Sequence, residues 1–124
     1  MTSMPASYRQ FEAGPDPWGT TWTVEFRWLQ NAITIRHEDG VDVKFFLRSG
    51  DTLLEKIVAL YHPHLLALSR RLGREITDAW CMKLAALHIK RIIETGQDWE
   101  KTLVKPSMAE LEDYAAELET APAR

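Results

Sequence analysis

The architecture of this chain is set by residues 22–47, which read WTVEFRWLQNAITIRHEDGVDVKFFL. Apolar and polar side chains alternate in the first part of this stretch, where the residues on one side are Trp22, Val24, Phe26 and Trp28. A period of two is typical of a β-strand with one buried face. The stretch therefore predicts an antiparallel sheet, and its apolar positions indicate how the strands pair.

Turn positions in the same stretch predict a register. A two-residue turn at residues 30–31 and a three-residue loop at residues 38–40, with Gly40 in a left-handed conformation, keep the apolar residues on one face. The expected pairs are Trp28 with Ile33, Phe26 with Ile35, Ile35 with Val43, and Ile33 with Phe45. The result is a three-stranded antiparallel meander whose apolar face carries Trp22, Val24, Phe26, Trp28, Ile33, Ile35, Val41, Val43, Phe45 and Leu47. The opposite face carries a row of solvated charges, namely Glu25, Arg36 and Asp42.

Helical spacing follows the sheet. Thr52 and Glu55 form a capping box that predicts the start of a helix, and Gly73 is a suitable end for it. Pro63 lies inside this segment, where it either kinks one helix or ends it and begins another. Thr77 predicts the start of a second long helix, which is expected to stop at Gly96.

The second long helix has a wide apolar surface. Apolar side chains fill more than half of its circumference, and a narrow arc holds its charged residues Lys83, Lys90, Arg91 and Glu94. Such a helix must be covered on two sides. We expect the sheet on one side, and the first helix, the C-terminal segment or a second subunit on the other.

A short acidic helix is predicted near the C-terminal end. Ser107 and Glu110 form a capping box that precedes apolar residues at helical spacing, namely Met108, Leu111, Ala115 and Leu118. A helix of this length needs a surface on which to dock. Residues 70–105 carry more Lys and Arg than Asp and Glu, so we expect the acidic helix to dock on this part of the same chain.

These elements predict an α+β fold, in which a three-stranded antiparallel β-meander packs against two long α-helices and a short C-terminal acidic helix is added. The expected organisation is an N-terminal arm at 1–20, an α+β domain at 21–105, and a C-terminal helix and tail at 106–124. Proline and glycine are expected to keep the arm free of regular structure. Its three aromatic residues pack either on the domain or on a partner; they are Tyr8, Phe11 and Trp18.

Composition narrows the class of function. A net charge of -3 over 124 residues argues against a surface that binds nucleic acid throughout. Cys81 is the only cysteine, which excludes an intrachain disulfide and a zinc site built on several thiolates. No apolar stretch has the length of a secretory signal or a membrane span, so we expect a cytoplasmic protein without membrane contact.

Catalytic motifs are missing from the sequence, which contains no GxSxG, phosphate-binding glycine loop, HExxH or CxxC. We therefore expect no catalytic residue, metal site or cofactor. A weaker alternative is a small metal or thiol enzyme, in which His37 meets Cys81 and His88. The simpler interpretation places Cys81 and His88 in the core.

A DNA-binding regulator is the second alternative, because residues 67–84 loosely resemble a helix-turn-helix pattern. Gly73 would lie in the turn and Thr77 would open the recognition helix. The residues placed near phosphates are Arg70, Arg71, Arg74 and Lys83. Trp80, however, stands where a polar side chain that contacts bases is expected.

The preferred hypothesis is a non-catalytic protein-interaction protein, either a small subunit or accessory factor of a larger assembly or a homo-oligomer. It rests on the aromatic arm, the wide apolar side of the second helix and the presence of five tryptophans. The candidate interaction residues are Tyr8, Phe11, Trp18, Trp80, Trp99, Met108, Leu111 and Leu118. The sequence leaves open whether the arm or the helix makes the contact.

Overall fold

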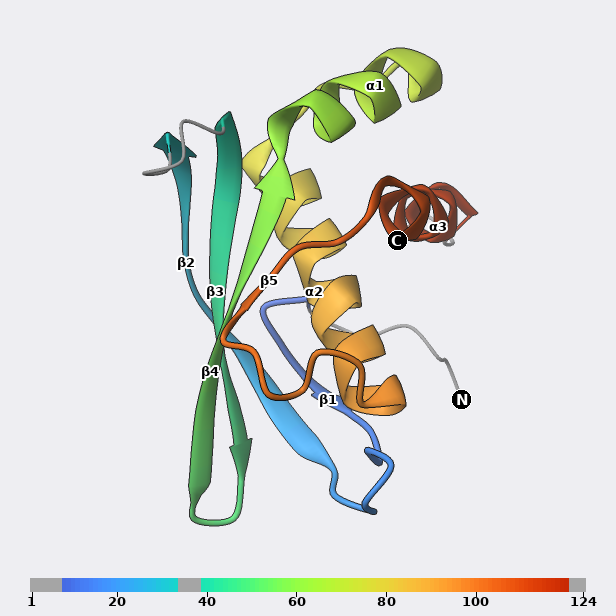
Figure 1. Ribbon diagram of the computed structural model, residues 1–124. Coiled ribbons are helices and arrows are strands. Elements are labelled where there is room, and N and C mark those ends of the chain that lie inside the picture. Colours follow the sequence, from blue (N-terminus) through green and yellow to red (C-terminus); the bar gives the residue numbers. More distant parts are fainter. Residues whose placement is uncertain (1–7, 34–38, 121–124) are drawn as a thin grey trace.

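The computed structural model describes residues 8–33 and 39–120. Within these residues the fold is α+β, with one five-stranded mixed sheet and three helices that all lie on one side of it (Figure 1). The elements in chain order are β1 (Gln10–Ala13), β2 (Trp22–Ile33), β3 (Asp39–Ser49), β4 (Thr52–Tyr61), α1 (His62–Leu72), α2 (Asp78–Thr95), β5 (Leu103–Val104) and α3 (Met108–Thr120). The strands lie side by side in chain order. The strands from β1 to β4 pair with one another in antiparallel fashion, whereas β5 runs parallel to β4.

The predicted register of the meander is wrong, because β2 continues through residues 30–31 without a turn. Val24 pairs with Leu47 and Phe26 pairs with Phe45, so each predicted partner of a β2 residue is replaced. A two-residue hairpin turn favours residues that adopt a positive φ, and the Gln-Asn pair at 30–31 suits this poorly. Gly40 lies in β3 rather than in a loop. Ile35, Arg36 and His37 lie outside the described residues.

A β-bulge at Arg27 reverses the alternation of β2. Phe26 pairs with Phe45 and Trp28 pairs with Lys44, so Arg27 is an additional residue between two consecutive pairs. Trp22 and Val24 are buried on the helix-facing side, as predicted. Beyond the bulge, Trp28 turns to the opposite side, and the strict alternation that placed it in the core is wrong there.

The helix predicted to begin at Thr52 is also wrong, because Thr52–Tyr61 forms β4. β3 and β4 form a hairpin through Gly50 and Asp51, and Gly50 has a φ of 57°, a left-handed conformation that glycine adopts without strain. α1 begins only at His62, with Pro63 in its first turn. Pro63 therefore starts a helix, but because the segment before it is a strand, neither a kinked helix nor a helix broken at Pro63 is observed.

The predicted starts of the other two helices are confirmed by their capping bonds. The Thr77 hydroxyl accepts a hydrogen bond from the Trp80 backbone N–H at 3.1 Å, and α2 ends at Gly96. At α3, the Ser107 N–H donates to a carboxylate oxygen of Glu110 at 2.9 Å, and the Glu110 N–H donates to the Ser107 hydroxyl at 3.1 Å. These bonds are local, which is why a single sequence reveals them.

The second layer is built around α2, which is covered on both sides as its apolar pattern predicts. Eleven of its eighteen residues are buried between the sheet and the other two helices. α3 covers the side of α2 that faces away from the sheet, and Figure 1 shows it beyond α2 from the strands. Arg71 pairs with Glu112 at 2.7 Å, and Arg74 pairs with Glu119. The expected docking of the acidic helix on the basic part of the chain is therefore confirmed.

The expectation that residues 1–20 contain no regular structure is wrong at one place. Gln10–Ala13 forms β1, which pairs with the beginning of β2. Phe11 and Ala13 are buried by this pairing. This part of the arm is therefore an edge strand of the sheet.

The Thr77 cap provides a test of the α2 boundary. Thr77→Ala is expected to lower the free energy of unfolding by about 1 kcal/mol, because the Trp80 N–H loses its acceptor. Thr77→Ser keeps the hydroxyl and is expected to retain most of the stability. Urea unfolding followed by circular dichroism measures both variants. A Thr77→Ala protein as stable as the parent would contradict the assigned cap.

Candidate functional site

The residues predicted to make interactions are mostly used by the fold itself. Phe11, Trp80 and Leu111 are buried in the core. The side chains that pack partly buried against that core are Tyr8, Trp99, Met108 and Leu118. Trp18 is the one candidate that stays largely exposed, with 66% of its surface accessible. The eight positions therefore do not form one continuous exposed surface.

Trp18 is presented by a turn that Asp16 organises. The Asp16 carboxylate accepts hydrogen bonds from the Trp22 indole N–H at 3.0 Å and from the Trp18 and Thr20 backbone N–H groups at 3.0 Å and 2.8 Å. These bonds, led by that of Trp22, hold the pKa of the Asp16 carboxyl below its ordinary value. The ring of Trp99 lies 6.3 Å from that of Trp18 and 5.4 Å from that of Trp22, so the turn is fastened to the loop after α2.

A different surface gathers most of the exposed apolar residues. Trp28 pairs with Lys44, Lys44 with Ile57, and Ile57 with Leu103, which makes one row across β2, β3, β4 and β5. Residues paired across a sheet point to the same side. Phe45 and Val58, the neighbours of this row, are buried under the helices, so the row points away from them. We call this side of the sheet the outer face.

The outer face carries four of the five large hydrophobic residues that are exposed among the described residues. Their accessible fractions are 36% for Trp28, 48% for Leu53, 42% for Tyr61 and 40% for Leu103. Half-buried Phe46, Ile57 and Ala59 lie between them on the same side. Figure 1 shows the helices on the opposite side only, and no described helix covers this one. Grouped exposed apolar residues indicate a contact surface more often than single ones do.

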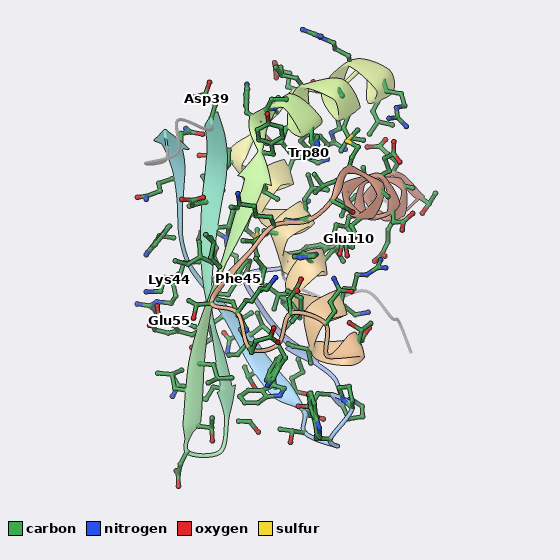
Figure 2. All side chains as sticks on the ribbon, viewed as in Figure 1. Asp39, Lys44, Phe45, Glu55, Trp80 and Glu110 are labelled. Atoms are coloured by element: carbon green, nitrogen blue, oxygen red, sulfur yellow. The ribbon has the colours of Figure 1, made fainter. Side chains whose placement is uncertain are left out.

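Charged side chains on the outer face are held in place by its aromatic rings. Lys44 forms an ion pair with Glu55 at 2.9 Å, and its ammonium lies 5.4 Å from the ring centre of Phe46. The Arg27 guanidinium lies 4.8 Å from the same ring. Figure 2 shows Lys44 and Glu55 on the side away from the helices and Phe45 on the side facing them. The Phe46 ring is therefore flanked by two cationic side chains, Arg27 and Lys44.

Lys56 is a buried charged residue on the side of the sheet that faces the helices. Its ammonium donates hydrogen bonds to the backbone carbonyl of Trp99 at 2.5 Å and to that of Lys101. Burial lowers the pKa of Lys56, against the opposing effect of Glu100 and Asp98. Because its ammonium donates to two carbonyl groups, Lys56 holds the loop between α2 and β5 against the sheet.

Two of the three proposed metal or thiol residues, Cys81 and His88, are described by the structure, and both are buried in α2. Cys81 is buried, and burial followed by the charge of Asp78 raises the pKa of its thiol to about 12, so the thiol stays protonated. His88 Nδ1 is hydrogen-bonded to the Tyr114 hydroxyl at 2.7 Å instead. His37 lies outside the described residues. Within residues 8–33 and 39–120, no three ligand-type side chains are grouped to hold a metal ion.

The helix-turn-helix residues are also engaged within the fold. Arg71 and Arg74 form ion pairs with α3, and the Arg74 guanidinium lies 5.5 Å from the ring centre of Trp80. Lys83 lies over the Tyr8 ring at 5.7 Å, and Arg70 is exposed in the last turn of α1. α2 itself is packed on both sides, which argues against its entry into a DNA groove.

Comparisons with known proteins leave the site to be judged from its own geometry. No protein-family model matches the chain, and searches of curated proteins and of solved structures also give no match. None of the helices in the described part of the chain is long and apolar enough to cross a bilayer.

The sequence reasoning missed the exposed residues Leu53, Tyr61 and Leu103. The available signal was the Gly50-Asp51 pair, which is typical of a hairpin turn and is followed by the β-branched residues Ile57 and Val58. The capping-box pattern at Thr52 and Glu55 competes with this signal and favoured the wrong element. The sequence contains no comparable signal for Leu103, because β5 has only two residues and forms through its pairing with β4.

His88 gives a pH test of the packing between α2 and α3. Burial lowers the pKa of His88 to about 4, against the opposing effect of the Glu110 and Asp98 carboxylates, and its Nε2 has no hydrogen-bond partner among the described residues. An unfolded histidine has a pKa of about 6.5, so the unfolded state binds more protons between the two values. Stability is therefore lost as the pH falls through this window.

We expect the parent protein to lose about 2 kcal/mol more than His88→Gln when the pH is lowered from about 7 to about 5. Urea unfolding at both pH values gives the comparison, in which the effects of the carboxylates common to both proteins cancel. Equal losses in the two proteins would show that His88 is not buried in its neutral form.

Proposed function

We propose that this protein is a non-catalytic protein-interaction protein, and that its contact surface is the outer face of the sheet. The observation that carries the proposal is the position of Trp28, Leu53, Tyr61 and Leu103 on one side of the sheet, opposite the helices. Exposed apolar groups of this size gain free energy when a partner removes them from water. The protein acts as a small subunit or accessory factor of a larger assembly, or as a homo-oligomer.

The state of the reactive groups supports an interaction role over an enzymatic one. The Cys81 thiol is protonated and buried, and His88 is bound to Tyr114 inside the helical layer. The Lys56 ammonium is occupied by backbone carbonyls. Each of these side chains thus has a structural role, and none lies at a surface where a substrate would reach it.

The charge distribution supports a protein partner over nucleic acid. On the outer face, strands β2 to β4 carry three basic residues, Arg27, Lys44 and Arg48, and three acidic residues, Glu25, Asp42 and Glu55. A nucleic-acid site requires a basic surplus. A cytoplasmic location is part of the proposal, in keeping with a single cysteine that is buried as a free thiol.

Photo-crosslinking in the cells that produce the protein tests this proposal. A benzoylphenylalanine at Leu103 or Leu53 is expected to give a discrete adduct with a protein, because both side chains point out of the proposed surface. The matched control is the same probe at Ala116, which is exposed on α3 on the helical side of the molecule. We expect no adduct from the control.

Two results would contradict the proposed function. One is the absence of any protein adduct from both outer-face positions. The other is an identical set of adducts from the outer face and from position 116, which would indicate random collisions.

A further inference from the structure

We infer that the occupant of the outer face is a second copy of this chain. The inference rests on the proposed function and specifies the partner. Two sheets would pack face to face about a two-fold axis that runs along the row Trp28, Lys44, Ile57 and Leu103. The helices would then lie on the outside of a four-layer sandwich, and both faces of each sheet would be covered.

The apolar residues of the outer face are unevenly distributed across the strands. On β4 and β5 they are Leu53, Ile57, Ala59, Tyr61 and Leu103, with Glu55 as the only charged residue between them. The charged residues lie mainly on β2 and β3. A two-fold axis along the row superposes β4 and β5 on their copies. This arrangement superposes the apolar half of the face on its own copy and leaves most of the charges in the other half, on β2 and β3.

The pairing of rows under this axis is complementary. Ile57 and Leu103 lie on the axis and meet their own copies, while Leu53 and Tyr61 lie on opposite sides of it and meet each other. Lys44 also approaches its own copy, and its ion pair with Glu55 at 2.9 Å offsets that charge. Apart from Glu55, which would face Ala59 of the copy, the outer-face residues of β4 and β5 therefore meet apolar partners.

Charge favours a second copy over a strongly charged partner. The three basic and three acidic residues of β2 to β4 balance, and two of these pairs already exist, Lys44 with Glu55 and Arg48 with Glu25. A nucleic acid or a highly charged peptide finds no complementary field on such a face. A copy with the same mixture of charges has no net repulsion there.

The size of the face is sufficient for two copies. At about 3.3 Å per residue and about 4.8 Å per strand, ten residues each of β2, β3 and β4 and the two residues of β5 give about 500 Å² per copy. Two copies would bury about 1,000 Å², the area that a specific interface is expected to reach. Sheets that pack in this way lie about 10 Å apart. We therefore expect a reversible dimer of moderate affinity.

Sedimentation equilibrium with opposite charges at one position tests the inference. Leu103→Glu and Leu103→Arg are each expected to weaken self-association at least about tenfold, because like charges would face each other across the axis. An equimolar mixture of the two variants is expected to recover association. Leu103 is partly exposed, so these changes spare the core, and circular dichroism of each variant confirms the fold.

Trp18→Ala is the matched control, because Trp18 is the one large exposed hydrophobic residue among the described residues that is not on the outer face. Its self-association is expected to equal that of the parent. Loss of association in Trp18→Ala, but not in the Leu103 variants, would place the contact on the aromatic turn and overturn the inference.

Other outcomes also decide the matter. A parent protein that is still monomeric at about 1 mM overturns the second copy. So does a mixture of the Leu103 variants that stays as weak as each variant alone. If the parent is monomeric but the probe at position 103 captures a different protein, the proposed function stands and the inference fails. If no adduct forms and no dimer forms, both fail.

Discussion

The burial of α2 on both sides is the constraint on which the rest of the structure depends. Eleven of its eighteen residues are buried, so the helix cannot lie at a surface. The sheet covers one side, and α3, held by ion pairs from Arg71 and Arg74, closes the other. Because this arrangement uses every described helix on one side of the sheet, none remains for the outer face. The open apolar sheet is thus a consequence of how the core is closed.

Buried polar groups in this fold hold turns, loops and helices in place through hydrogen bonds. Asp16 holds the turn that carries Trp18, and Lys56 holds the loop that carries Trp99. His88 and Tyr114 join α2 to α3. Each group has at least one hydrogen-bond partner far along the chain or in a local turn, although His88 Nε2 has none among the described residues. Asp16, Lys56 and His88 therefore have structural roles, and the proposed function assigns the contact to the outer face instead.

Local signals located the starts of α2 and α3 but wrongly predicted a helix at Thr52, and long-range pairing explains much of what they missed. Thr77, Ser107 and Glu110 cap helices through bonds within three residues, so the sequence alone locates α2 and α3. The bulge at Arg27 depends on how β2 fits against β3, which no local pattern contains. The same gap affected the site. Trp80 was predicted to make an interaction but is buried in the core, because which aromatic residues are covered depends on tertiary packing.

Amide chemical shifts in a dilution series test directly whether a second copy binds to the outer face, because they report which residues are affected by it in solution. If a second copy covers the outer face, we expect concentration-dependent shifts in β4, β5 and the neighbouring part of β3, while the buried amides of α2 do not change. Shifts confined to α1, α3 or the Trp18 turn would contradict it. So would a spectrum that does not change at any concentration.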